Sequence, residues 1–473
     1  MKNIERFAVT EDQLRALVAE GLKDGGDWCD LYFEDTVYND FLLRDSEVSS
    51  AGYHVDRGCG IRVLKGEKTG YAYAESTAYE DLVRAARTAA SIASVASAKA
   101  QPPFRSMSSA QVRPNDCYPV RLSWDSFDCG GFAPFLKGIE AGIRSRESRT
   151  LKVIAMLSWS MSEILMYNSL GELTTDSRPL GSISVQAVFR QGGRTEMVNV
   201  SRSLRTGAEL ICPEVAEDLI SRAVGGVDRL FEARRPKGGQ MPVVMGAGAS
   251  GILLHEAMGH AFEADFNRKG QSVFAGKTGT RICRKGINII DDGTLPASRG
   301  SCNYDDEGVP GQKTYMVTDG ILTSYLHDRI SAWSCGVPPT GNGRRESFRY
   351  NPIPRMRATY MESGCDGSLD DLIASVRQGI FVDQFANGQV KIGEGDFTFY
   401  VKSGALIENG RLTMPVKDIN IIGNGPQALA DIEAVAGDLR IDESTWTCGK
   451  EQSVAVSCGI PSVLIGRLTV GGE

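Results

Sequence analysis

The sequence has few histidines and no closely paired cysteines. Only four His residues occur among 473, and none of the eleven Cys residues forms a Cys-x-x-Cys pair. The cysteine spacing excludes a zinc ribbon and gives no sign of a disulfide framework, so a reducing compartment is expected.

Long apolar runs and an excess of basic residues are also missing. No segment approaches the roughly 20 apolar residues of a membrane-spanning helix, and the N-terminus lacks the apolar core of a secretory signal. The net charge is −7, with 52 basic and 59 acidic residues, whereas nucleic-acid binding needs a basic face. We therefore expect a cytoplasmic protein that binds neither a membrane nor nucleic acid.

The first part of the chain alternates helical and strand patterns. A capping box at 10–13 begins a helix, strands follow between 28 and 75, and an alanine-rich helix is expected at 79–99. Proline and serine in 101–114 are typical of a linker. These patterns predict an N-terminal α+β domain at residues 1–105.

The rest of the chain divides into a mixed and a strand-rich part. Strands are expected at 151–157, 162–168 and 182–200, and an amphipathic helix at 213–235. This predicts a middle α+β region at 106–236, packed with the first domain, and a β-rich C-terminal domain at 237–473. A chain of 473 residues is too long for one small hydrophobic core, so two or three domains are expected. The fold class expected from these patterns is α+β.

One short segment carries two of the four histidines. His255 is followed directly by Glu256, and His260 lies five positions after the first His. On an ideal α-helix, residues five apart diverge by about 140° around the axis. Both rings can bind one metal only if the helix widens locally, and Gly259 is where a π-type bulge is easiest to place. The alternative is an ordinary helix with one surface and one core histidine.

A catalytic zinc site usually has three protein ligands and an open position for water. The local candidates for the third ligand are Glu263 and Asp265. The distant candidates are the cysteines, His54 and His327. The residues alone leave these alternatives open.

Two polar segments outside the helix also deserve interpretation. Asp305, Asp306 and Glu307 form an acidic run that we expect to be a solvated loop. Arg344 and Arg345 follow a glycine-rich stretch and are candidates for binding a peptide carboxylate or a developing oxyanion. A salt-bridged turn is the alternative for these two arginines.

The segment at 251–266, Gly-Ile-Leu-Leu-His-Glu-Ala-Met-Gly-His-Ala-Phe-Glu-Ala-Asp-Phe, resembles the TldD/PmbA family of metallopeptidases, also called modulators of DNA gyrase. Other blocks resemble the family in the same order, so the resemblance covers nearly the whole chain. These blocks lie at 57–62, 69–73, 305–308, 340–347, 421–426, 448–450 and 468–472. The gyrase-related name finds no support in the acidic charge balance.

The resemblance implies a ligand set. The family's two histidines and the cysteine of a Cys-Gly-Lys stretch correspond to His255, His260 and Cys448, and Glu256 takes the general-base position. Cys458, in a strand pattern, is the second choice. This chain reads Cys-Gly-Lys-Glu-Gln where relatives often have one residue more, so the local turn is expected to differ.

The expected function is zinc-dependent hydrolysis of small or unfolded peptides, as in leader-peptide removal or proteolytic clearance. By resemblance, the chain is a TldD-type subunit whose partner is a TldE-type paralogue or a second copy. One alternative is a non-catalytic, TldE-like binding partner on the same fold, although such members lack the His-Glu-His helix. Another is a thiol enzyme that uses Cys448 as the nucleophile.

Overall fold

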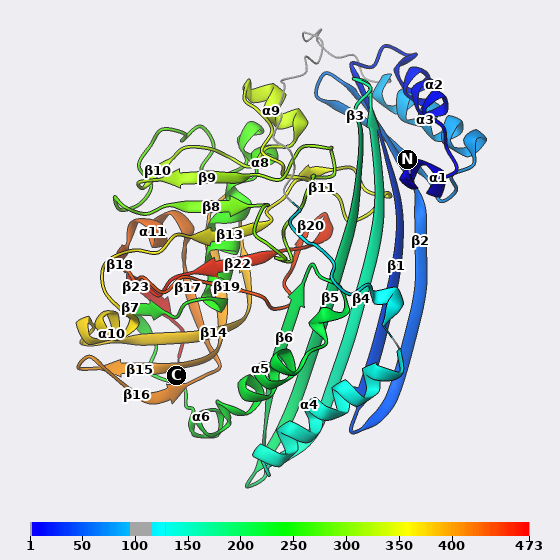
Figure 1. Cartoon of the computed structure of the whole chain (residues 1–473). Coiled ribbons are helices and arrows are strands. Elements are labelled where there is room, and N and C mark those ends of the chain that lie inside the picture. Colours follow the sequence, from blue (N-terminus) through cyan, green and yellow to red (C-terminus); the bar gives the residue numbers. More distant parts are fainter. Residues whose placement is uncertain (1, 95–115, 128, 473) are drawn as a thin grey trace.

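A long antiparallel sheet of six strands, ordered β3-β2-β1-β4-β5-β6, forms one side of the molecule (Figure 1). Its strands are β1 (Trp28–Arg44), β2 (Glu47–Lys65), β3 (Lys68–Ala74), β4 (Thr150–Asn168), β5 (Leu173–Gln191) and β6 (Arg194–Leu204). At about 3.4 Å per residue, the 19-residue strands β2, β4 and β5 are on the order of 60 Å long. The sheet joins strands from the first two expected domains.

The computed structural model describes residues 2–94, 116–127 and 129–472. The linker predicted at 101–114 lies outside the described residues, as does the boundary expected at 105. The boundary expected near 236 falls between a helix at Val227–Glu232 and a strand at Gly239–Met245, and the division into three domains stays a prediction. Within the described part of the chain, no helix is long and apolar enough to cross a membrane.

Strands are present at the three places predicted in the middle region, but their boundaries were wrong. The strands expected at 151–157 and 162–168 are one continuous strand, β4. The strand expected at 182–200 is divided between β5 and β6 by a turn at Gly192 and Gly193, whose φ angles are 54° and 85°. A two-residue hairpin turn of type I′ needs positive φ at both positions, which glycine adopts readily, so this diglycine was the missed signal.

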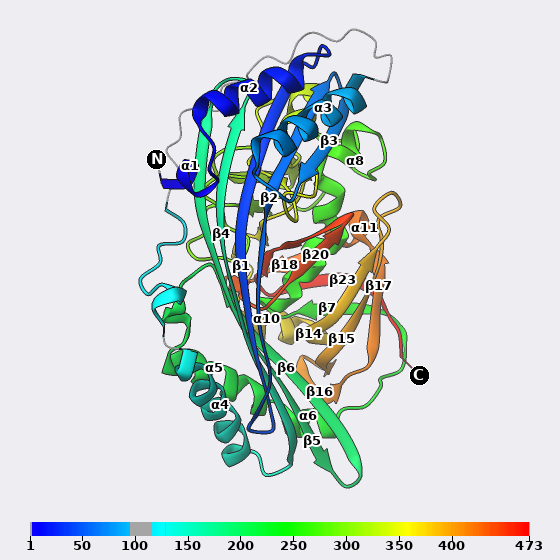
Figure 2. The same ribbon diagram turned by 90° about the vertical axis from the view of Figure 1, so that its right-hand side faces the viewer.

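Helices cover the sheet toward its two ends (Figures 1 and 2). One group is α1 (Lys2–Arg6), α2 (Glu11–Leu22) and α3 (Tyr79–Ser94), and the other is α4 (Phe132–Arg146), α5 (Pro213–Val224) and α6 (Val227–Glu232). The predicted capping box is confirmed, since the Gln13 amide donates to Thr10 Oγ1 over 3.2 Å and the Thr10 amide donates to Gln13 Oε1 over 2.9 Å. The helix expected at 213–235 is interrupted at Gly225 and Gly226.

The C-terminal part contains two further sheets, which lie beside the long sheet (Figure 2). The larger one consists of β7 (Gly239–Met245), β14 (Gln378–Val390), β15 (Asp396–Glu408), β16 (Arg411–Val416), β17 (Ile419–Asn424), β18 (Ile432–Val435) and β23 (Val463–Val470). The other consists of β8 (Ile289–Asp292), β9 (Lys313–Thr318), β10 (Ile321–Leu322), β13 (Ala358–Met361), β19 (Arg440–Asp442) and β22 (Ser457–Ile460). The predicted α+β class with a β-rich C-terminal part is confirmed.

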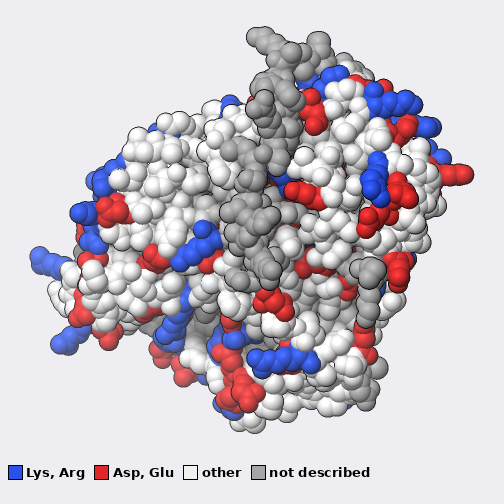
Figure 3. All heavy atoms as spheres, turned by 45° about the horizontal axis from the view of Figure 1, so that its top comes forward, with Lys and Arg blue, Asp and Glu red and all other residues white. Residues whose placement is uncertain are grey.

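Short elements complete the C-terminal part. Two small ladders pair β11 (Gly343–Arg344) with β12 (Ile353–Pro354) and β20 (Thr447–Lys450) with β21 (Gln452–Ala455). The helices are α7 (Ile252–Leu254), α8 (Ala264–Arg268), α9 (Arg329–Cys335), α10 (Leu369–Ser375) and α11 (Gly425–Ala430). One apolar core contains residues from α7, from both the six- and the seven-stranded C-terminal sheets and from the β20–β21 hairpin. On the face drawn in Figure 3, acidic and basic side chains are interspersed.

The acidic run is buried, so its prediction as a solvated loop was wrong. Asp305, Asp306 and Glu307 are 0%, 5% and 5% exposed. Arg178 of β5 contacts Asp306, and Arg62 of β2 lies 2.7 Å from Glu307 Oε1. Buried carboxylates need partners of this kind. The acidic run therefore connects the long sheet to the C-terminal part.

We expect Arg62→Met to lower the free energy of unfolding by about 3–5 kcal/mol, because removing one partner leaves buried charges uncompensated. Arg62 is 0% exposed and also lies 2.6 Å from Asp30, so two buried carboxylates would each lose a cationic partner. Chemical denaturation measures the effect. Arg84→Met is the control, since Arg84 is 74% exposed beside Asp81 and should change the stability by less than about 1 kcal/mol. Equal losses in both variants would contradict a stabilising role for the buried pair.

Candidate metal centre

The helix that carries both histidines is widened at the predicted place. Strand β7 leads through a glycine-rich turn into α7, and His255–Gly259 then forms a π-helical turn. The His260 amide donates to the carbonyl of His255, five residues earlier, which is the π-type bond. The ring centroids of the two histidines lie 5.2 Å apart. The predicted departure from α geometry is confirmed.

Gly259 has a different role from the one expected. Its φ and ψ of −57° and −47° are ordinary right-handed values, so the turn does not need a glycine for backbone freedom. A Cβ atom at this position would lie 2.0 Å from Met356 Sδ. The absence of a side chain therefore lets the widened turn pack against the segment that precedes β13.

Cys448 reaches the same place from the β20–β21 hairpin. Its Sγ lies 3.3 Å from His260 Nε2, and one ligand atom each of His255, His260 and Cys448 lie within 4.8 Å of one another. All three residues are buried, at 1%, 4% and 3% exposure. The turn between the strands is tight, with Glu451 at φ 57°. The structure thus brings together the three residues that the family resemblance singles out.

This cluster fits a metal ion. Neither ring nitrogen of His255 has a hydrogen-bond partner among the described residues, although buried polar atoms normally have one. Burial raises the pKa of the Cys448 thiol, but His255 and His260 outweigh burial and lower that pKa to about 4. Two imidazoles, which bind a metal in their neutral form, and one thiolate form a set of ligands typical of transition-metal sites. The role of each residue as a ligand stays a prediction.

A buried ionic group surrounds His260. Glu263 Oε2 lies 2.9 Å from His260 Nδ1, on the ring nitrogen other than the one that faces Cys448. Lys450 Nζ donates to Glu263 Oε2 over 2.9 Å and to Asp265 Oδ1 over 2.8 Å. Metal-binding histidines commonly have such a carboxylate on the second nitrogen, where it fixes the ring orientation. Glu263, one of the local ligand candidates, therefore fits an orienting role, which sequence reasoning missed.

The proposed base and the second-choice cysteine lie near the cluster. Glu256 directly follows His255 and is partly exposed, whereas its helix neighbours are buried. Cys458 lies on β22, is 1% exposed, and is not a member of the three-residue cluster. Burial, followed by Asp442 and Glu256, raises the pKa of Cys458 well above its ordinary value. Cys458 therefore stays a thiol in a buried strand.

The two other histidines are separate from the cluster. His54 is exposed on β2 and stacks on Tyr38, with ring centroids 4.5 Å apart. His327 is buried, its Nδ1 lies 3.2 Å from Ser331 Oγ, and burial lowers its pKa to about 4. Both histidines fit structural roles.

Arg344 and Arg345 are buried rather than displayed on a loop. Arg344 donates to the carbonyls of Met356 and Ala455 over 2.5 and 2.7 Å. Arg345 donates to the Asp306 carbonyl over 3.0 Å and lies 3.5 Å from Asp30. The salt-bridged alternative thus describes Arg345 in part, and a substrate-binding role for either arginine stays a prediction.

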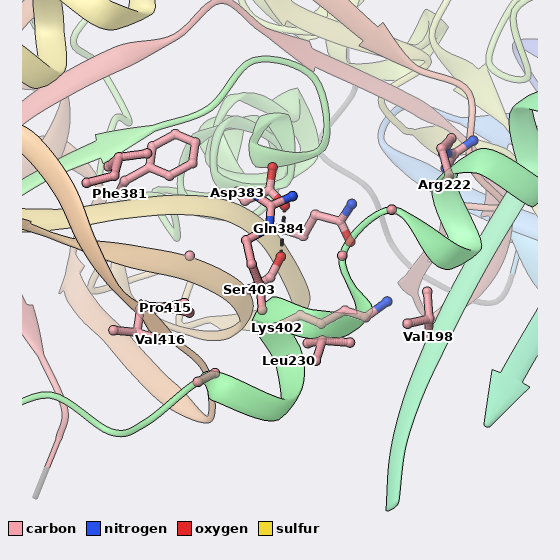
Figure 4. A pocket seen from close by; sticks show the side chains of 16 residues that line it. Val198, Arg222, Leu230, Phe381, Asp383, Gln384, Lys402, Ser403, Pro415 and Val416 are labelled. Carbon is pink, nitrogen blue, oxygen red and sulfur yellow. Dashed lines mark hydrogen bonds between the residues drawn. The ribbon is translucent and has the colours of Figure 1, made fainter. Parts of the chain in front are cut away.

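A groove runs between the long sheet and the C-terminal sheet. One cavity has a volume of about 270 Å³. Strand β6 and helices α5 and α6 form one wall, and strands β14–β16 form the other. Figure 4 shows Arg222 and Val198 across from Asp383 and Gln384. A second cavity of about 500 Å³ shares Arg222, Gln384 and Lys402 with the first. It extends to Ala249 and Trp446, which precede the histidine helix and Cys448. The groove therefore approaches both elements of the cluster.

Similarity to known protein families identifies the chain as a metallopeptidase. The family models that match describe PmbA/TldA metallopeptidase domain 1 at residues 29–93, the central domain at 132–226 and the C-terminal domain at 238–472. The chain belongs to the PmbA/TldD family of metallopeptidases, as the sequence blocks predicted.

Two named relatives agree with this assignment, and one solved structure shares the fold. A metalloprotease TldD homolog from Haemophilus influenzae is 38% identical over 452 residues, which cover 94% of this chain and 93% of the relative. A zinc metalloprotease TldD homolog from Saccharolobus solfataricus is 33% identical over 62% of this chain and 65% of the relative. The structure of TldE from Thermococcus kodakarensis has a TM-score of 0.74 at 20% identity and covers 97% of this chain and 100% of that one. At that identity, the last similarity concerns the fold alone.

Proposed function

We propose that the chain is a zinc-dependent peptidase in which His255, His260 and Cys448 bind the metal. The observation that carries the proposal is the buried His255 ring, whose two nitrogens lack partners among the described residues beside a thiol and a second imidazole. Two imidazoles and one thiolate form a zinc donor set with room for a fourth ligand. One relative, the Saccharolobus solfataricus protein, carries zinc in its name.

The chain's own residues have distinct tasks in this reaction. A bound zinc ion supplies Lewis acidity, which polarises a carbonyl and acidifies water. Glu256 accepts a proton from the attacking water on its carboxylate and passes this proton to the leaving amine nitrogen. Glu263 holds His260 Nδ1, and Lys450 in turn holds Glu263, so this ring keeps one orientation throughout the reaction.

The substrates we propose are small or unfolded peptides, such as leader segments or unfolded chains awaiting clearance. Support comes from burial, because residues that are 1–4% exposed are out of reach of a folded protein surface. An extended peptide lying in the groove between the sheets would approach both elements of the site. Because the protein would contact mainly the main chain of the peptide, the enzyme would have only a weak preference for the substrate sequence.

The partner we propose is a TldE-type paralogue, or a second copy when the chain is made alone. Support comes from the fold shared with a TldE structure and from the long sheet, which forms one side of the molecule (Figure 1). A second subunit would enclose the groove and restrict entry to narrow, flexible chains. The cytoplasm is the proposed location.

The test combines hydrolysis with particle size. We expect the purified chain, sized as a two-subunit particle by light scattering, to cleave unfolded peptides, to lose this activity with a chelator and to regain it with zinc. A folded protein of the same length as the unfolded substrate is the matched control, and it should not be cleaved. Cleavage that continues in excess chelator would rule out the metal, and cleavage by a stable monomer would show that no partner is needed.

A further inference from the structure

A third cavity, which is polar and has a volume of about 160 Å³, lies between the long sheet and the β20–β21 hairpin. It is separate from the groove of Figure 4 and contains none of the three cluster residues. Its lining includes five arginines, namely Arg178, Arg205, Arg344, Arg345 and Arg357. We refer to it as the arginine pocket. The carboxylates that line it are Glu34, Asp306 and Glu346.

The charges of the arginine pocket do not balance. Asp306 contacts Arg178, and its carbonyl accepts from Arg345. No carboxylate of the described residues lies within 4.0 Å of a guanidinium nitrogen of Arg205, Arg344 or Arg357. By contrast, Arg178 is paired with Asp176 and Asp306, and Arg345 lies beside Asp30. Burial raises the pKa of Glu34 to about 7, which reduces its negative charge further. The pocket therefore holds more cations than anions.

Donor groups of these arginines also lack acceptors. The Nε atoms of Arg205 and Arg345 are buried without a hydrogen-bond partner in the described part of the chain. Arg344 and Arg357 satisfy their donors with backbone carbonyls, which neutralise no charge. Unpaired buried guanidinium groups are costly. An anion with two acceptor oxygens would satisfy such groups, because the guanidinium fork matches a carboxylate.

The size and position of the pocket limit the ligand. A volume of about 160 Å³ holds roughly five water molecules at about 30 Å³ each, so it suits a carboxylate with a few attached atoms. Ser453, Val454 and Ala455 of β21 line it, and Val454 is the cross-strand partner of Cys448. Directly opposed residues lie about 5 Å apart. The pocket is therefore one strand away from a proposed metal ligand.

We propose that the arginine pocket binds a carboxylate of the peptide substrate, either the C-terminal carboxylate or that of an Asp or Glu side chain. This inference rests on the proposed function and adds a substrate class to it, namely peptides with a negative charge at a fixed position. Arg205 is the residue best suited to a test. It is partly exposed, and the one side-chain hydrogen bond that it makes to the described residues, to the Pro179 carbonyl, is long at 3.5 Å.

The experiment measures binding rather than cleavage. The full-length chain, stripped of metal so that no peptide is consumed, is titrated against three dye-labelled six-residue peptides built from uncharged residues. The first has a free C-terminal carboxylate, the second a C-terminal amide, and the third the amide with one internal Glu. We expect the first to bind about 10-fold more tightly than the second, as a charge-assisted hydrogen bond provides. Tight binding of the third assigns the pocket to side-chain carboxylates.

Variants locate the preference in the pocket. Arg205→Gln should remove the preference for a carboxylate, and Arg205→Lys, which keeps the charge but not the guanidinium fork, should retain part of it. Arg202→Gln is the matched control from β6, since Arg202 is paired with Glu443 at 2.6 Å and lies outside the pocket lining. It should leave the preference unchanged. Equal affinity for all three peptides, absence of binding, or a preference that survives Arg205→Gln would overturn the proposal.

The two proposals fail in different ways. If a carboxylate preference is measured but zinc-loaded chain never cleaves a peptide, the pocket stands and the peptidase function falls. If peptides are cleaved but bind equally with and without a carboxylate, the function stands and the pocket assignment falls.

Discussion

Cys448→Ser is expected to reduce the zinc content of the purified chain from about one ion per chain to nearly none. The Cys448 thiolate is the only sulfur in the described three-residue cluster, and a serine hydroxyl is not deprotonated at neutral pH. Loss of an outer-shell partner already weakens metal binding about 10- to 100-fold, so loss of a direct ligand should exceed about 100-fold. Elemental analysis after dialysis, together with a competition titration, measures both quantities.

Cys458→Ser is the matched control. Cys458 is equally buried but lies on β22, outside the cluster, so its variant should keep the zinc content of the parent. Zinc lost in the Cys458 variant and kept in the Cys448 variant would show that the ligand assignment is wrong. The same measurement decides against a thiol enzyme, because a Cys–His nucleophile pair works without a metal and would leave the parent chain free of zinc.

Local sequence patterns predicted the parts of the fold that depend on neighbouring residues. The capping box at Thr10 and the widened helix at His255 each follow from residues within one or two turns. The diglycine that separates β5 from β6 was equally local, and its positive φ angles make it a signal that sequence reasoning can use. The continuity of β4 was also accessible, because Ser158 and Ser160 alternate with the buried Leu157 and Trp159 in the two-residue period of a strand.

Features that depend on distant partners could not be read from the sequence. The acidic run was expected in solvent because its partners, Arg62 and Arg178, belong to strands far away in the chain. Lys450 is 187 residues from Glu263, so no spacing rule connects the two. The resemblance to the family pointed to Cys448, and the structure adds the carboxylate and the lysine that hold His260 in place.

Glu256→Gln is expected to lower peptide hydrolysis by about 1,000-fold or more while the zinc content stays near that of the parent. The amide keeps the shape of the side chain but accepts no proton, and general acid–base catalysis commonly contributes 10²- to 10⁴-fold. Glu256 is the partly exposed member of the π turn, which leaves it accessible to water. Steady-state hydrolysis of an unfolded peptide and elemental analysis of the same sample test both parts.

Glu263→Gln provides the contrast that separates a base from an orienting carboxylate. Glu263 lies against His260 Nδ1 and Lys450, so its loss should weaken zinc binding about 10- to 100-fold. Added zinc should then restore much of the activity of this variant, whereas saturating zinc should not rescue Glu256→Gln. Near-ultraviolet circular dichroism checks that both variants are folded. Retained hydrolysis in Glu256→Gln would show that this residue is not the base. Loss of zinc from the same variant would show that Glu256 is a metal ligand, because replacing a proton acceptor that does not contact the metal should not release the metal.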